Sequence, residues 1–178
     1  YAFSYFSPYS KNGKGTRAQG IGYRKDKFTL SDWHYFWACD TPDVMTQNDK
    51  GSNGNFNRGG CCCILTHKDT GEKIFVMNNH GCLNDQSNID AAPVYVEMEK
   101  KYNKESLPSF FVGDMNAKQS TEEGSVYMIY TSHWTDSFLK AAKRTGVVGT
   151  YNGFKHPTGS SRIDFVFYRG EGITPQLY

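Results

Sequence analysis

The stretch Ser109-Phe110-Phe111-Val112-Gly113-Asp114-Met115-Asn116-Ala117 is an apolar segment that ends in a glycine, a carboxylate and, two residues later, an amide. Its apolar half predicts a buried strand, and in extended chain Asp114 and Asn116 share a face. Such a strand delivers both side chains to the end of a sheet, where they suit a hard cation, a water molecule or a phosphate group. An Asx turn after a strand is the alternative interpretation.

A second segment, Lys73 to His80, also passes from apolar to polar residues at its end and places Asn78 and His80 on one face. A histidine at the end of a strand usually has a structural role. Beside Asp114, however, an imidazolium would stabilise charge on a phosphate group or protonate a leaving oxygen near neutral pH.

A third carboxylate, Asp164, lies among apolar residues in the predicted strand Arg162–Tyr168. A buried Asp without a partner is costly. Two interpretations stay open: a salt bridge with Arg162, two residues away on the same face, or a carboxylate that orients a catalytic histidine.

The segment Asn57-Arg58-Gly59-Gly60 precedes a further predicted strand. A guanidinium next to two residues without side chains allows a phosphate group to approach closely, so Asn57 and Arg58 are candidates for substrate binding. A merely solvated arginine is the alternative.

Strands dominate the predicted regular structure, because β-branched and aromatic residues cluster between turn residues. The predicted strands are Gly20–Arg24, Phe28–Trp37, Cys61–His67, Lys73–Asn79, Ser109–Gly113 and Arg162–Tyr168. The connection Lys68-Asp69-Thr70-Gly71-Glu72 suits an antiparallel hairpin between the third and the fourth of these.

Three helices are expected between the strands. The first has Pro93 in its first turn and a buried stripe formed by Ala91, Tyr95, Met98 and Tyr102. The second starts at a capping box on Ser120 and runs toward Tyr130. The third extends from Asp136 to about Gly146. Strands and helices without strict alternation predict an α/β (α+β) domain of mixed sheets with helices outside.

Composition limits the class of protein. The 178 residues suit one domain, and 15% aromatic against 21% charged residues exclude a disordered chain. A net charge of +2 provides no global positive field for nucleic acid, so an anionic partner must be held locally. We find no apolar run long enough for a transmembrane segment and no signal segment at the start, and we expect a soluble monomer.

The five cysteines, Cys39, Cys61, Cys62, Cys63 and Cys82, are odd in number and lack C-x-x-C spacing. This pattern argues against a complete disulfide framework and against a zinc site. We therefore expect buried, unpaired thiols.

Five short motifs occur together in one order: Ile21-Gly22-Tyr23-Arg24-Lys25-Asp26-Lys27-Phe28, Thr41-Pro42-Asp43, Asn79-His80, Gly113-Asp114-Met115-Asn116-Ala117 and Arg162-Ile163-Asp164-Phe165. In this order, over most of Ile21 to Arg169, they resemble the endonuclease/exonuclease/phosphatase superfamily with the DNase I-like fold. The resemblance implies two mixed β-sheets packed as a sandwich with flanking helices. It also implies a phosphodiesterase, nuclease or phosphatase that depends on a divalent metal, Mg²⁺ or Mn²⁺.

The same resemblance assigns roles to individual residues. It implies that Asp114 orients or activates the attacking water, that Asn116 holds a phosphate oxygen or that water, and that His80 assists the leaving group. Asp164 would orient a second histidine, and Asp114 with Asn116 would hold the metal. Asn57-Arg58 is similar to the phosphate-contacting segment of the DNase I branch. The implied partner is a phosphate-ester substrate: a nucleic acid, a phospholipid headgroup or a small phosphodiester.

The sequence departs from the family pattern at both ends. The principal metal-binding Glu and an active-site Asn of the family have no counterpart before Ile21, and the closing Ser-Asp-His element has none before Tyr178. His80 is followed by Gly81-Cys82 instead of the commoner Leu-Asp. We therefore expect residues 1–178 to be a single domain truncated at both ends, with a non-catalytic phosphate-binding module or pseudoenzyme as the alternative.

Overall fold

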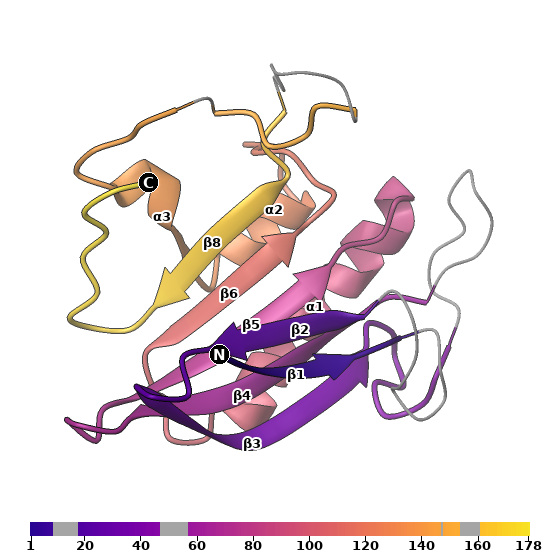
Figure 1. Cartoon of the computed structure of the whole chain (residues 1–178). Coiled ribbons are helices and arrows are strands. Elements are labelled where there is room, and N and C mark those ends of the chain that lie inside the picture. Colours follow the sequence, from indigo (N-terminus) through magenta and orange to yellow (C-terminus); the bar gives the residue numbers. More distant parts are fainter. Residues whose placement is uncertain (9–17, 47–56, 147, 154–160) are drawn as a thin grey trace.

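The computed structural model describes residues 1–8, 18–46, 57–146, 148–153 and 161–178. Among these residues, six strands form one mixed sheet in the order β3-β4-β5-β6-β8-β7 (Figure 1). Their bounds are β3 Phe28–Trp37, β4 Gly59–His67, β5 Lys73–His80, β6 Ser109–Asp114, β7 Thr135–Asp136 and β8 Asp164–Arg169. Only β5 and β6 pair in parallel, and the helix α1 (Asp85–Tyr102) makes the crossover that such a pair requires.

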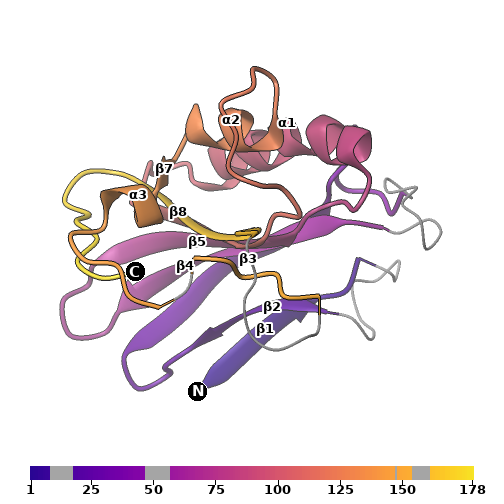
Figure 2. The same cartoon turned by 90° about the horizontal axis from the view of Figure 1, so that it is seen from above.

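A second, smaller sheet pairs β1 (Ala2–Phe6) with β2 (Gln19–Tyr23) in antiparallel orientation. It covers one face of the large sheet beside β3, β4 and β5, while α1 and α2 (Val126–Thr131) cover the other face (Figure 2). The predicted sandwich of two sheets with flanking helices is thus confirmed, although the smaller sheet is antiparallel and not mixed. The sequence analysis missed β1.

The core has two parts, one on each face of the large sheet. Phe36, Phe75, Phe111 and Phe167 belong to the part packed against the helices. Cys61, Cys63 and Leu65 belong to the part beneath the small sheet, whereas Cys62 and Ile64 face the helices. Because β4 is buried on both faces, its sequence is an uninterrupted apolar run.

The predicted hairpin is confirmed: β4 and β5 pair in antiparallel orientation, and Gly71 in their connection has a φ of 75°, which favours glycine. In α1 the expected stripe is also confirmed, since Ala91, Tyr95 and Met98 are buried against the sheet. The position predicted for Pro93 is wrong. The helix begins at Asp85, capped by Asn84, and Pro93 lies well inside it, on its exposed side.

The other two helix predictions need correction. Ser120 does not begin a helix, because its Oγ accepts a hydrogen bond from the Glu122 N–H (3.0 Å) and so closes a turn. Ser125 caps α2 instead, accepting from the Met128 N–H. The third helix, α3, is the single turn Ser137–Lys140, and Ala141 already has an extended ψ of 132°. None of the helices in the described ranges combines the length and apolar character needed to cross a bilayer.

The five cysteines all lie in the described ranges and form no disulfide bond with one another, and all but Cys39 are buried. Burial raises the pKa of the Cys63 thiol to about 12, and it also raises the pKa of the Cys61 and Cys62 thiols. Because the thiolate is the reactive form, we expect a disulfide reagent such as 5,5′-dithiobis(2-nitrobenzoate) at pH 8 to label Cys39 alone in the folded protein.

All five thiols should react after unfolding in guanidinium, and Cys39→Ser should abolish labelling of the folded protein. Rapid labelling of two or more thiols before unfolding would contradict the buried placement of the cysteine-rich strand.

Candidate active site

Three strands meet at one edge of the large sheet, and their register sets a row of polar side chains there. The parallel strands β5 and β6 both end at this edge, and β8, antiparallel to β6, begins at it. The register pairs His80 with Asp114 and Asp114 with Asp164. These three predicted residues, far apart in the sequence, therefore lie side by side; we call them the polar row.

The polar row is accessible from solvent. The side chain of His80 is 43% exposed and that of Asp114 is 33% exposed, and the His80 Nε2 lies 3.6 Å from the Asp114 Oδ2. This distance is too long for a direct hydrogen bond but close enough for an electrostatic interaction. The arrangement places an imidazole, which can donate or accept a proton, beside a carboxyl group at the surface.

Burial raises the pKa of the Asp114 carboxyl group above its ordinary value, and the neighbouring charge of Asp164 acts in the same direction. The backbone N–H of Asn116 and the positive charges of His80 and Arg58 act in the opposite direction. A carboxylate with a raised pKa is a stronger base, which suits a group that accepts a proton from water.

Asn116 lies directly beyond the row, in a strained left-handed conformation with a φ of 45°. Its N–H donates to the Asp114 Oδ1 (2.8 Å), and its Nδ2 donates to the Gly81 carbonyl oxygen (3.0 Å). The side-chain amide is thereby oriented, and its Oδ1 makes no hydrogen bond to any described residue. The Asx turn suggested by the sequence and the proposed site role therefore coexist at this position.

The sequence analysis missed Asn88, which fixes this loop from α1. Its Nδ2 donates to the Met115 carbonyl (2.9 Å) and the Asn116 carbonyl (3.3 Å), while its Oδ1 accepts from the Cys82 N–H (3.2 Å). Asn88 is 2% exposed. Thus one buried amide joins the chain after β5 to the chain after β6. Nothing in the sequence distinguished Asn88 from other polar helix residues.

Arg162 does not pair with Asp164, so the salt bridge considered between them is wrong. Its guanidinium forms two hydrogen bonds with the buried carboxylate of Asp136 (3.0 and 2.6 Å) and a third with the Gln119 Oε1 (3.1 Å). The backbone N–H of Asp164 donates to the Thr150 hydroxyl. The start of β8 is therefore anchored on both sides, and the Asp164 carboxylate stays available in the polar row.

Asn57 and Arg58 lie just before β4 at the same edge and are both buried. The positive charge of Arg58 is one of the influences that lower the pKa of the Asp114 carboxyl group. Gly59 and Gly60, which follow Arg58, are required by the close packing of β4 against Phe36 of β3. A Cβ on Gly59 would lie 2.1 Å from the Phe36 carbonyl oxygen, and one on Gly60 would lie 2.7 Å from the Phe36 ring. The lack of a side chain at both positions allows β3 and β4 to approach closely.

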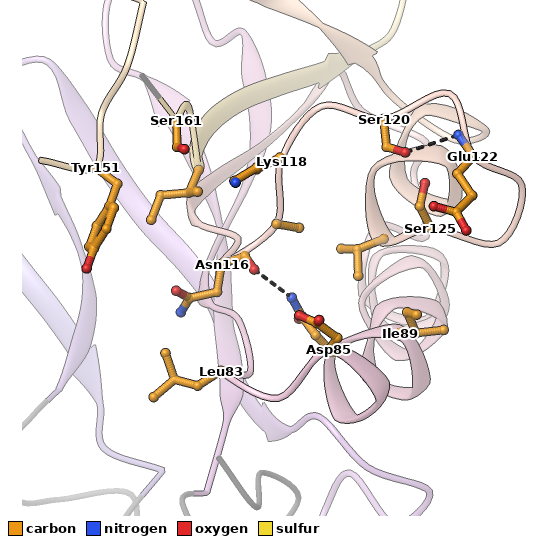
Figure 3. Close-up of a pocket in the computed structure, with 14 residues that line it drawn as sticks. Leu83, Asp85, Ile89, Asn116, Lys118, Ser120, Glu122, Ser125, Tyr151 and Ser161 are labelled. Atoms are coloured by element: carbon orange, nitrogen blue, oxygen red, sulfur yellow. Dashed lines mark hydrogen bonds between the residues drawn. The ribbon is translucent and has the colours of Figure 1, made fainter. Parts of the chain in front are cut away.

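A cavity of about 640 Å³ opens beside Asn116 (Figure 3). In the view of Figure 3, Tyr151 and Leu83 lie on one side of it, and Glu122 and Ser125 lie on the other. Its volume is within the range of about 300–1,000 Å³ that is usual for small-molecule sites. The polar row thus has a concave surface next to it.

The polar row and the adjacent Asn116 offer oxygen ligands for a hard cation, namely the carboxylates of Asp114 and Asp164 and the amide Oδ1 of Asn116. Within the described ranges no group of three or more His, Cys, Asp or Glu side chains is arranged to hold a metal ion. Mg²⁺ is nevertheless commonly bound by one or two carboxylates together with water and substrate phosphate. These residues fit that kind of partial site.

No protein-family model matches the chain. No curated protein matches the sequence either. Solved structures do match. A mannosyl-6-phosphatase from Bacteroides thetaiotaomicron is 27% identical with a TM-score of 0.83, and the alignment covers 98% of this chain and 65% of that one. An endonuclease/exonuclease/phosphatase family protein from the same organism is 28% identical with a TM-score of 0.80, covering 93% and 60%.

A more distant match is TDP2 from D. rerio, solved in complex with a single-stranded DNA product. It is 20% identical with a TM-score of 0.61, and the alignment covers 98% of this chain and 64% of that one. At this identity the likeness concerns the fold alone. The three alignments cover 60–65% of the other proteins, so this chain spans somewhat less than two thirds of the length of each.

Proposed function

Because the chain has the DNase I-like fold of the endonuclease/exonuclease/phosphatase superfamily, we propose that it is a phosphoric ester hydrolase that depends on a divalent metal. The observation that carries the proposal is the polar row. Strand register brings His80, Asp114 and Asp164 together at one edge of the large sheet, and the Asn116 N–H donates to the Asp114 carboxylate.

The reaction we propose is hydrolysis. The oxygen of a water molecule bonds to phosphorus, the bond between phosphorus and the alcohol oxygen breaks, and the products are an alcohol and a phosphate group. Asp114 accepts the proton that the water loses, while a protonated His80 donates a proton to the leaving alcohol oxygen. Asn57 and Arg58 hold the phosphate oxygens, for which a guanidinium is well suited.

Asp114 and Asn116 would hold the metal ion, Mg²⁺ or Mn²⁺. When bound, such an ion relieves the negative charge that develops on the phosphate oxygens. Asp164 extends the row by one strand. In our proposal the Asp164 carboxylate orients a second histidine and does not itself transfer a proton.

The first test is hydrolysis of bis(p-nitrophenyl) phosphate and p-nitrophenyl phosphate by the longest natural form of the protein that contains residues 1–178. We expect release of p-nitrophenol with Mg²⁺ or Mn²⁺, loss of this activity after treatment with EDTA, and recovery after the metal is restored. His80→Ala should reduce the rate, whereas the matched control His67→Ala, at the opposite end of β4, should not.

Activity that is insensitive to EDTA would overturn the metal dependence. Calorimetric binding of inorganic phosphate without turnover of either ester, weakened by Arg58→Ala, would instead identify a non-catalytic phosphate-binding module.

A further inference from the structure

The cavity beside Asn116 is formed by the same segments that carry the polar row. The chain continues from His80 to Leu83, from Asp114 to Lys118, and from Ser161 to Asp164, and Leu83, Lys118 and Ser161 all line the cavity. A phosphate ester held at the row would therefore extend its organic part into this space. In Figure 3, Asn116 lies between the loop at Leu83 and the loop at Lys118.

The charged side chains of the cavity are not engaged elsewhere in the described part of the protein. The Lys118 amine makes no hydrogen bond or ion pair to a described residue, and the same holds for the carboxylates of Asp85 and Glu122. By contrast, the backbone N–H of Glu122 bonds to the Ser120 Oγ, which fixes the position of that loop. The Lys118 amine and the carboxylates of Asp85 and Glu122 thus line the cavity and are available to a ligand.

The charges of this lining favour some organic groups of a substrate over others. Two carboxylates and one lysine give the charged lining a net negative charge, which disfavours additional phosphates of a nucleic acid or of a polyphosphate. Carboxylates accept hydrogen bonds from hydroxyl groups, and Lys118 donates to them. The one aromatic side chain of the lining, Tyr151, is 53% exposed and provides a single ring face at the rim.

We propose that this cavity binds the polyhydroxylated alcohol part of a phosphate monoester, such as the ring of a sugar phosphate, and that Lys118 and Glu122 determine this specificity. The proposal rests on the proposed hydrolase function and names the substrate class of the same site. The ring hydroxyls donate to the Glu122 carboxylate and accept from the Lys118 amine, while the phosphate group lies at Asn116 and the polar row.

The test compares kcat/KM for mannose 6-phosphate and glucose 6-phosphate with kcat/KM for p-nitrophenyl phosphate, which lacks the hydroxyl groups. We expect Lys118→Met and Glu122→Gln each to lower this ratio by about tenfold, the usual effect of losing a hydrogen bond to a charged group. The matched control is Lys104→Met at an exposed turn after α1, which should leave the ratio unchanged.

The possible outcomes separate this inference from the proposed function. If p-nitrophenyl phosphate is hydrolysed but the ratio is the same in all variants, or if a dinucleotide is the preferred substrate, the assignment of the cavity is wrong. If no ester is hydrolysed, the proposed function fails. In that case, calorimetric binding of mannose 6-phosphate tests the assignment of the cavity separately. Weaker binding to Lys118→Met supports this assignment, and unchanged or absent binding overturns it.

Discussion

Replacing Asp114 by Asn is expected to reduce kcat/KM for p-nitrophenyl phosphate by about 10²- to 10⁴-fold, the range for loss of a general acid or base. The introduced amide keeps an oxygen that accepts the Asn116 N–H, so the loop after β6 should keep its conformation. What the amide lacks is the negative charge that accepts a proton and binds a cation.

The same substitution should not reduce stability. Burial raises the pKa of Asp114, which means that the folded environment disfavours the charged form. A neutral amide removes this penalty, so the thermal midpoint should stay unchanged or rise slightly. The matched control is Asp69→Asn, an exposed carboxylate in the hairpin between β4 and β5. An Asp114→Asn protein that keeps more than a tenth of the activity would show that another group activates the water.

Replacing Asp136 by Ala is expected to lower the free energy of unfolding by about 3–5 kcal/mol, the usual cost of removing one partner from a buried ion pair. Asp136 and Arg162 are 1% and 4% exposed at their side chains. The lost carboxylate also accepts the Tyr127 hydroxyl (2.9 Å) and the Phe138 N–H that begins α3 (3.0 Å). After the substitution, the Arg162 guanidinium retains the Gln119 amide as its hydrogen-bond partner.

Urea denaturation at neutral pH measures this loss. The control is Glu105→Ala, which breaks the exposed ion pair with Lys73 (3.0 Å) and should cost less than about 1 kcal/mol. Equal effects of the two substitutions would show that the buried pair contributes little. Arg162→Met, which removes the guanidinium that lies over the Phe165 ring but keeps an aliphatic side chain, should cost less than Arg162→Ala.

Most of the strands were predictable because their signals are local, whereas β1 and β7 were missed. The apolar runs of β4 and β6 and the Gly-containing turn before β5 identify strands without any knowledge of their partners. The helix ends were less predictable, because capping depends on which of several nearby candidates is used. Ser120 and Ser125 both lie within six residues before the apolar segment that begins at Val126, and the turn at Ser120 is closed by its contact with the Glu122 N–H. Pro93 was misplaced because proline is tolerated on the exposed side of a helix supported by tertiary packing.

At the site, the predicted residues were those at the ends of strands, where a change from apolar to polar sequence is visible. His80, Asp114 and Asp164 follow this pattern, and the structure brings them together. Their catalytic and metal-binding roles remain predictions. The partners of Arg162 and the role of Asn88 were not predictable, since each depends on a contact between segments that are distant in sequence.

The register that aligns the polar row also bears on when the proposed activity can appear during folding. The β4–β5 hairpin is local and can form early, but β6 joins β5 only after α1 has crossed over, and β8 pairs with β6 across a long intervening segment. Until β8 is in place, Asp164 is absent from the row and the segment at Ser161 is absent from the cavity wall. Enzymatic competence should therefore return in the slowest refolding phase, after most of the secondary structure has formed.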